Sequence, residues 1–199
     1  MTPNDGPRCQ FCDQPIDAGR RCQPCKDAAP AFNKIRAPYL YGGPVADLIH
    51  ELKYGGQEHR IKALVRLVLD DEGVQTILAD GGVLVPIPLT RRRQRQRGFN
   101  QSALFARQLA SLTSLSVSHV LCRQGDEPPQ RPLSLSERMR LSSKSFGLRS
   151  APVPPKIILL DDVVTSGATL RAASGCLKAA GAQSVHALAL ARTSDPSGP

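Results

Sequence analysis

The sequence predicts an α/β fold in which a parallel sheet is flanked by helices, with a small four-cysteine module at the N-terminus. Strand and helix patterns alternate through the second half of the chain, and two C-x-x-C pairs stand before residue 30. Such alternation implies parallel strands joined by right-handed crossovers. The predicted strands are 83–88, 116–122, 157–160 and 185–191, and the predicted helices between them are 101–112 and 167–180.

Composition points to a protein that acts on anions. The chain has 199 residues and a net charge of +9, with 41% hydrophobic residues and no tryptophan. An aliphatic core is therefore available, and the expected partner is a phosphate-rich ligand or a nucleic acid. Residues 1–8 lack the apolar segment of a signal peptide, and no run approaches the ~20 apolar residues of a transmembrane helix. We expect a cytoplasmic protein without membrane insertion.

The N-terminal module, predicted over 1–30, depends on four cysteines. Cys9 and Cys12 form one C-x-x-C pair, and Cys22 and Cys25 form a second. Each pair can supply two thiolates to one tetrahedral ion, and cysteines in a cytoplasmic chain favour metal over disulfides. We expect structural Zn²⁺ that contributes folding free energy. Two disulfides or a redox C-x-x-C are the alternatives.

Residues 31–82 are predicted to form a short strand and flanking helices. A short strand at 39–41 precedes two amphipathic helical patterns, one beginning at Pro44 and one carrying apolar residues from 61 to 68. Both patterns repeat apolar residues at helical spacing. This segment carries no readable signature for a nucleobase.

An arginine-rich segment follows the predicted strand 83–88, which ends in Pro-Ile-Pro. Proline cannot donate to a ladder, so the end of the strand is well marked. If this strand runs parallel to 157–160, the arginines leave from the same sheet edge and can pair with phosphate oxygens. A solvated arginine loop is the alternative. The expected anion-binding residues on this side are Pro86, Ile87, Pro88, Arg91 and Arg97.

The connection 123–155 is polar and rich in proline. Loops of such length inside a compact domain are usually functional or disordered. We expect a functional or mobile loop, with a disordered basic linker as the alternative.

The stretch 157–169 combines a buried strand, an acidic pair and a hydroxyl-rich loop. The acids follow the strand, at the edge where open α/β sheets bind ligands, and the loop opens a helix whose free N–H groups suit a phosphate. Carboxylates can hold ribose hydroxyls, so the order predicts a site for a ribose 5-phosphate. Its residues are Asp161, Asp162, Thr165, Ser166, Gly167, Ala168 and Thr169.

Two other interpretations of this stretch carry less weight. A Walker B strand also ends in acids, but it requires a G-x-x-x-x-G-K-[ST] partner, which the chain lacks. The stretch could also be a buried strand whose end is acidic without function. Adjacent carboxylates repel each other, which argues against that interpretation.

The stretch 157–169 resembles the motif that binds phosphoribosyl pyrophosphate in type I phosphoribosyltransferases. The chain as a whole is similar to the ComF family of competence-associated, phosphoribosyltransferase-like proteins. Five landmarks follow in the same order: the four-cysteine module, Leu52-Lys53-Tyr54, Pro86-Ile87-Pro88, Arg97-Gly98-Phe99-Asn100-Gln101 and the motif at 157–169. The resemblance implies a type I phosphoribosyltransferase-like core over 83–192, a hood or flanking helices over 31–82, and a flexible loop over 123–155 that closes over the site. Residues 193–199 are polar without a packing signal, so we expect a disordered tail there.

The resemblance implies two functions of different kinds. As an enzyme, the chain would bind phosphoribosyl pyrophosphate with Mg²⁺, hold the ribose through Asp161 and Asp162, and transfer the ribosyl 5-phosphate to an acceptor, as in nucleotide metabolism or salvage. As a binding protein, it would act in natural competence and DNA uptake, with single-stranded DNA and other competence proteins as partners.

Overall fold

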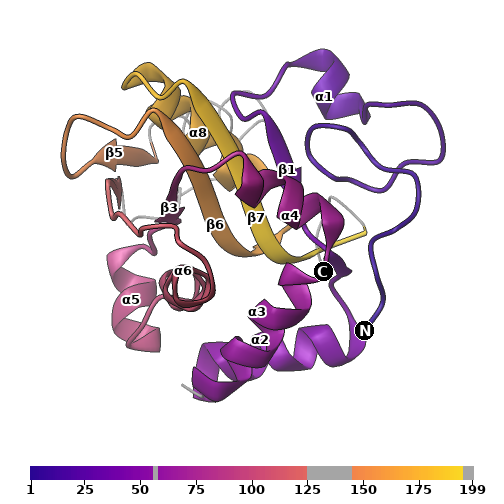
Figure 1. Cartoon of the computed structure of the whole chain (residues 1–199), viewed down its shortest axis with the longest axis horizontal. Coiled ribbons are helices and arrows are strands. Elements are labelled where there is room, and N and C mark those ends of the chain that lie inside the picture. Colours follow the sequence, from indigo (N-terminus) through magenta and orange to yellow (C-terminus); the bar gives the residue numbers. More distant parts are fainter. Residues whose placement is uncertain (56–57, 125–144, 195–199) are drawn as a thin grey trace, which may run out of the picture.

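The structure is a computed structural model, and it describes residues 1–55, 58–124 and 145–194. The centre of the fold is a five-stranded sheet in which every strand pair is parallel (Figure 1). The strand order is β1-β7-β6-β3, and β2 also pairs with β7. The strands are β1 Lys34–Arg36, β2 Tyr39–Leu40, β3 Val83–Pro86, β6 Lys156–Val164 and β7 Ser184–Arg192. The predicted α/β class with a parallel sheet is confirmed.

Strand β6 carries core residues on both faces of the sheet. Ile157 and Leu159 pack on the side of helix α8 (Ala168–Ala179), whereas Ile158 and Leu160 pack on the opposite side. All four side chains are at most 1% exposed. Successive side chains of a strand point to opposite faces, so an unbroken apolar run is what a strand buried on both sides requires.

Helices from two parts of the chain share the second face of the sheet. Ile61 and Val68 lie in the same core cluster as Phe105 and Leu109, and all four are fully buried. The apolar stripes read from the sequence therefore face the sheet as expected. The helices on this face are α2 Gly43–Gly55, α3 Glu58–Leu69, α4 Glu72–Ala79 and α6 Gln101–Leu112.

The arginine run forms a helix, α5 (Arg91–Arg97), where the sequence suggested a loop. Arginine and glutamine are good helix formers, and the segment has a defined start and end. The Thr90 side chain accepts a hydrogen bond from the main-chain N–H of Arg93. Gly98 ends the helix in the left-handed conformation at φ 76°, which glycine adopts without strain. The helix therefore sets the face from which each arginine side chain leaves.

The predicted strand 116–122 was wrong in extent and partner. Only Val117 bridges to β3, through Leu84. The chain then turns away, and β4 (Leu121–Arg123) pairs antiparallel with β5 (Phe146–Leu148) in a separate two-stranded sheet. The residues on either side of Val117 are serines, so too little apolar surface is present to continue along the edge of the main sheet.

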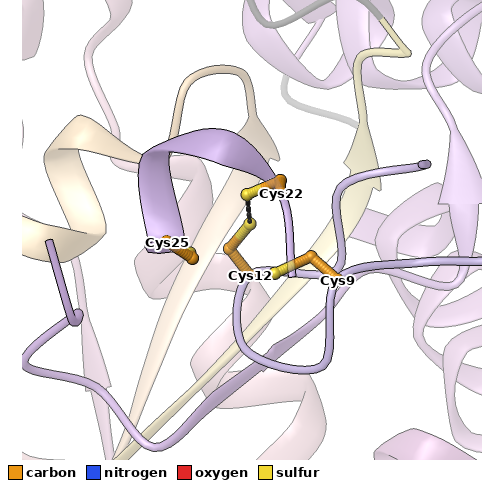
Figure 2. A group of neighbouring side chains, drawn as sticks. All are labelled: Cys9, Cys12, Cys22 and Cys25. Carbon is orange, nitrogen blue, oxygen red and sulfur yellow. Dashed lines mark hydrogen bonds between the residues drawn. The ribbon is translucent and has the colours of Figure 1, made fainter. Parts of the chain in front are cut away.

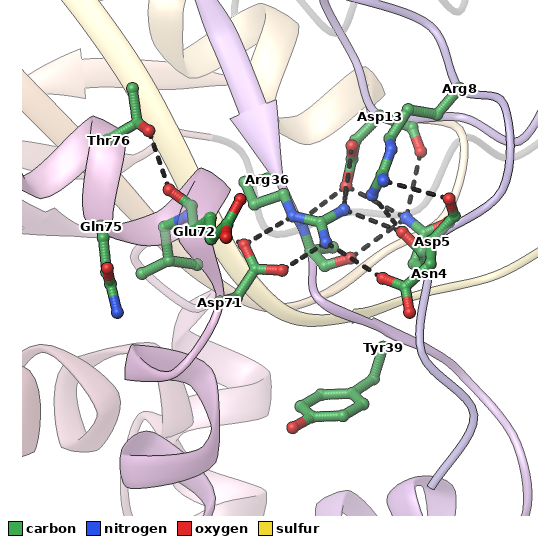
Figure 3. Close-up of polar contacts among 12 residues, drawn as sticks. Asn4, Asp5, Arg8, Asp13, Arg36, Tyr39, Asp71, Glu72, Gln75 and Thr76 are labelled. Atoms are coloured by element: carbon green, nitrogen blue, oxygen red, sulfur yellow. Dashed lines mark hydrogen bonds and ion pairs between the residues drawn. The ribbon is translucent and has the colours of Figure 1, made fainter.

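The N-terminal module includes helix α1 (Gln23–Asp27), and one of its contacts with the main sheet is a buried arginine of β1. Arg36 of β1 lies between two carboxylates: its Nη1 is 3.1 Å from Asp13 Oδ2, and its Nε donates to Asp71 Oδ1 at 2.8 Å (Figure 3). Asp13 belongs to the module, and Asp71 caps α4. The Arg36 side chain thus contacts the module, the sheet edge and the helical layer at once.

The structure shows how segment 31–82 and the first residues of segment 193–199 are arranged. Segment 31–82 supplies the strands β1 and β2 as well as helices. Thr193 is 6% exposed, and its main-chain N–H donates to the Val164 carbonyl.

Residues 125–144 of the predicted closing loop and residues 195–199 lie outside the described residues. None of the described helices is long and apolar enough to cross a membrane.

Candidate functional site

A cavity of about 350 Å³ lies at the carboxyl edge of β3 and β6, and we call it the edge cavity. The parallel register pairs Pro86 with Leu160, so the residues that follow each strand reach the same edge. Ligands of open α/β sheets bind at this edge. Of the predicted site residues, Ile87, Pro88, Arg97, Asp161, Asp162, Thr165 and Thr169 line the edge cavity.

The acidic pair lies within β6, because the strand continues through both aspartates to Val164. Asp161 Oδ1 accepts hydrogen bonds from the Ser102 hydroxyl at 3.2 Å and from the main-chain N–H of Asp162 at 2.9 Å. Asp162 Oδ1 accepts from the N–H of Val163 at 2.9 Å. Burial, and then the neighbouring charge of Asp162, raise the pKa of Asp161 to about 8. A cationic or hydroxyl-bearing ligand would relieve this repulsion.

The hydroxyl-rich loop turns from β6 into α8. Gly167 precedes the helix with φ 74°, a left-handed conformation that side chains rarely adopt. Thr165 and Thr169 line the edge cavity, one before the helix and one in its first turn. Ser166 is exposed and its hydroxyl accepts from the Ala168 N–H at 3.4 Å. The start of a helix can therefore bind an anion beside the two aspartates.

The arginines divide between two cavities. Arg93 and Arg97 line the edge cavity. Arg91 and Pro86, both predicted as part of the anion site, line a neighbouring cavity instead. Because helix α5 turns about 100° per residue, side chains two positions apart point in nearly opposite directions. The sequence analysis placed these arginines in one predicted anion site, whereas helix α5 directs them to two cavities.

Sequence reasoning missed several residues of the edge cavity. They are Tyr41, Gln101, Ser102, Arg123 and Thr193, which come from distant parts of the chain. Arg93 belongs to the predicted arginine run. Arg123 was assigned only to the start of a loop. In the structure it stacks on Phe146 with its guanidinium carbon 4.4 Å from the ring centre. Burial, and then the charge of Arg93, lower its pKa. No periodic signal marks such residues, because only the fold brings them to the edge.

Among these residues, Gln101 has a buried hydrogen-bond donor that a ligand could satisfy. It is 3% exposed, and its Oε1 accepts a hydrogen bond from Arg97 at 3.1 Å. Its Nε2 has no hydrogen-bond partner within the described ranges. Buried donors without partners are costly and uncommon. A donor that lines a cavity can instead be satisfied by a bound ligand.

The four N-terminal cysteines gather at one point (Figure 2). Their sulfur atoms lie within 4.8 Å of one another, and all four side chains are buried. The Sγ atoms of Cys12 and Cys22 lie 3.4 Å apart. Tetrahedral Zn²⁺ with Zn–S bonds of about 2.3 Å needs sulfurs about 3.8 Å apart, so the four thiols fit such an ion. Arg171 of α8 donates to Cys25 Sγ at 2.9 Å, which favours the thiolate that a metal requires.

Strand β7 connects the N-terminal module with the edge cavity. Arg192 is 1% exposed, and its Nη1 donates to the main-chain oxygen of Cys12 at 2.9 Å. The next residue, Thr193, lines the edge cavity. A site with four thiolate ligands leaves no open position for substrate. The cysteine cluster lies next to the strand end that carries Thr193, and a metal bound there would have a structural role.

Comparison with known proteins shows which family shares this architecture. No family model matches the chain. It is 30% identical over 201 residues to the DNA utilization protein YhgH of Escherichia coli K12, covering 96% of this chain and 87% of that protein. It is 26% identical over 194 residues to competence protein F of Haemophilus influenzae, with coverages of 94% and 85%. It is 30% identical to competence protein ComFC of Bacillus subtilis, with coverages of 93% and 78%. The chain belongs to the ComF family.

Proposed function

We propose that the edge cavity binds a 5-phosphoribosyl ligand, phosphoribosyl pyrophosphate with Mg²⁺, and that this binding serves a role in competence and DNA utilization. One observation carries the proposal. Asp161 and Asp162 share a cavity with Thr165 and Thr169 on one side and with arginines on the other. A diol, a phosphate and a pyrophosphate are the three groups that such walls would hold. The biological role rests on the names of the relatives.

Each wall of the edge cavity suits one part of this ligand. The aspartates would accept hydrogen bonds from the ribose 2′- and 3′-hydroxyls. Thr165 and Thr169, with the first N–H groups of α8, would bind the 5-phosphate. Arg93, Arg97 and Arg123 would pair with the pyrophosphate. Pro86 and Arg91 line the other cavity and have no part in this assignment.

The reaction that such a site supports is transfer of the ribosyl 5-phosphate. The bond from the anomeric carbon to pyrophosphate breaks, the pyrophosphate leaves, and a bond to the acceptor nucleophile forms. Positive charge develops on the ribose, so the two carboxylates would stabilise the transition state electrostatically. Mg²⁺ would neutralise charge on the pyrophosphate oxygens. Gln101 Nε2 would supply a hydrogen bond from the α6 side.

A second function, binding of a nucleic-acid backbone, has its own observation. The side chains from Arg91 to Gln96 of α5 are all exposed, and they include four arginines held on one short helix. Arginine guanidinium groups contact phosphates without regard to base sequence. The relative in Escherichia coli is named a DNA utilization protein, which agrees with such a surface.

Calorimetry with phosphoribosyl pyrophosphate and Mg²⁺ tests the first function. We expect saturable binding by the full chain, and at least tenfold weaker binding by Asp161→Asn/Asp162→Asn. Asp47→Asn/Asp70→Asn is the matched control, because both aspartates are exposed and neither lines the edge cavity. The control should bind like the wild type. Absence of binding to the wild type, or equal binding by the Asp161/Asp162 variant, would refute the proposal. Pyrophosphate release with candidate acceptors then tests for turnover.

A further inference from the structure

Helix α5 presents two pairs of arginines to two different cavities. Arg93 and Arg97 line the edge cavity, whereas Arg91 and Arg95 line a second cavity of about 480 Å³, which we call the α5 cavity. Residues four apart lie on the same helix face, and residues two apart lie about 200° from each other. The helix therefore forms a wall between two cationic sites.

The α5 cavity gathers charged side chains from distant parts of the chain. Arg91 and Arg95 come from α5, while His119 precedes β4 and Arg149 follows β5. Pro86 and Leu121 supply an apolar floor and are buried. Pro88 and Leu89 line both cavities, so the two sites adjoin. The volume lies in the range that small-molecule sites occupy, enough for a nucleotide unit.

The chemistry of the α5 cavity differs from that of the edge cavity. Its described lining residues include three arginines and no carboxylate, so it lacks the acidic pair that the edge cavity offers to a ribose diol. Neither Arg95 nor Arg149 forms an ion pair with a described residue, and both are exposed. Such guanidinium groups are available to an external anion. The lining suits phosphates and an unpaired base, and it lacks the recognition elements for a phosphoribosyl ligand.

We propose that the α5 cavity binds a phosphodiester segment of a single-stranded nucleic acid. The guanidinium groups of Arg95 and Arg149 pair with the strand's phosphates, and the apolar floor with His119 packs against a base. Single strands are bound in this way, by a basic groove beside surfaces on which unpaired bases can stack. This inference rests on the second proposed function and gives that function a site separate from the edge cavity.

Fluorescence anisotropy with labelled oligothymidylate across a range of salt concentrations tests the site. We expect Arg95→Gln/Arg149→Gln to bind at least tenfold more weakly than the wild type. Its slope of log K against log salt should be smaller by about 1.4, because each lost phosphate contact on a single strand removes about 0.7. The matched control is Arg66→Gln/Arg107→Gln. It removes the same charge from exposed positions that line neither cavity. We expect its affinity to stay within about twofold of the wild type. A melting curve of each variant establishes that it is folded.

Three outcomes would overturn the inference. Equal weakening of both double variants would mean that diffuse positive charge binds the strand. Displacement of the strand by inorganic phosphate at matched ionic strength would mean a site for a small anion. Absence of strand binding to the wild type would remove the inference together with the second function. Calorimetry with phosphoribosyl pyrophosphate tests the first function independently of these outcomes. We expect Arg95→Gln/Arg149→Gln to bind phosphoribosyl pyrophosphate as the wild type does.

Discussion

The hydroxyl of Ser102 donates a hydrogen bond to Asp161 Oδ1 at 3.2 Å. The serine lies in the first turn of α6 and the aspartate lies in β6, 59 positions further along the chain. Asn100 fixes the start of that helix, since its Oδ1 accepts from the Ser102 N–H and its Nδ2 donates to the Ile87 carbonyl. The two sides of the edge cavity are thereby held in one arrangement.

Removing the hydroxyl in Ser102→Ala should weaken the binding of phosphoribosyl pyrophosphate and shift its pH dependence. The hydrogen bond stabilises the charged carboxylate, so its loss raises the pKa of Asp161 further above its ordinary range. We expect about threefold weaker binding near neutral pH, consistent with one modest hydrogen bond, and recovery at higher pH. Calorimetry at several pH values measures this. Ser111→Ala, at an exposed serine near the end of α6, should show neither effect.

Asp161→Asn should stabilise the unliganded protein, and more so as pH rises. Burial and then Asp162 raise the pKa of Asp161 to about 8 in the folded state, against about 3.9 for an unfolded chain. Between these values the folded protein holds a proton that the unfolded chain has released, so this group's contribution to stability declines as pH rises through the window. In Asp161→Asn the side chain cannot ionise, so the free energy of unfolding does not decline for this reason.

Melting curves near pH 5 and near pH 9 measure this difference. We expect the melting temperature of Asp161→Asn to exceed that of the wild type by roughly 4 °C or more at the higher pH, which corresponds to about 1–2 kcal/mol for a chain of this size. The gain should be much smaller at the lower pH. Asp47→Asn serves as the exposed control. A gain that is the same at both pH values would contradict the assignment of a raised pKa to Asp161.

Removal of the Arg36 side chain in Arg36→Met should be strongly destabilising. The guanidinium forms an ion pair with the buried carboxylate of Asp13, which is 2% exposed. Loss of one partner of such a buried pair costs about 3–5 kcal/mol, because the other charge stays buried without compensation. Urea unfolding measures the change. In Arg36→Met/Asp13→Asn the penalty should be smaller than the sum of the two single changes. Full additivity would show that the two groups do not interact.

The purified chain should carry one zinc ion in reducing buffer. Four buried thiols within 4.8 Å of one another form a closed ligand set. Elemental analysis of the wild type and of Cys22→Ser/Cys25→Ser measures the metal, and the variant should lose it. Cys122→Ser/Cys176→Ser is the matched control, since both cysteines lie outside the cluster. Hydrogen exchange of residues 1–30 should accelerate in the metal-free protein, because the metal contributes folding free energy. A wild-type zinc content near zero would contradict the prediction.

The sequence could predict features whose residues are close together along the chain. Spacing alone indicated the four-cysteine cluster, and the structure gathers those four thiols. The apolar run before Asp161 predicted a strand buried on both faces, and β6 is that strand. Local chemistry fixes these features, since a tetrahedral ion requires paired thiols and a doubly covered strand requires unbroken apolar residues.

The sequence could not predict where the arginines of 91–97 point. A basic run is compatible with a loop or a helix, and the decision depended on the Thr90 cap and on Gly98 at the C-terminal end. Nor could periodicity assign Leu121 to a second sheet, because its partner Leu148 lies beyond the long connection. Pairing across such a distance depends on tertiary packing, which overrides local propensity.

By itself, the sequence determined the α/β class, the cysteine cluster and the order of strand, acids and hydroxyl-rich loop around Asp161. The tertiary structure decided the composition of the edge cavity, because Ser102, Arg123 and Thr193 come together only when β3, β6 and β7 align in parallel. It also decided that α5 separates two cationic sites. The physical reason is that a helix distributes neighbouring residues over opposite faces, while a parallel sheet gathers distant strand ends at one edge.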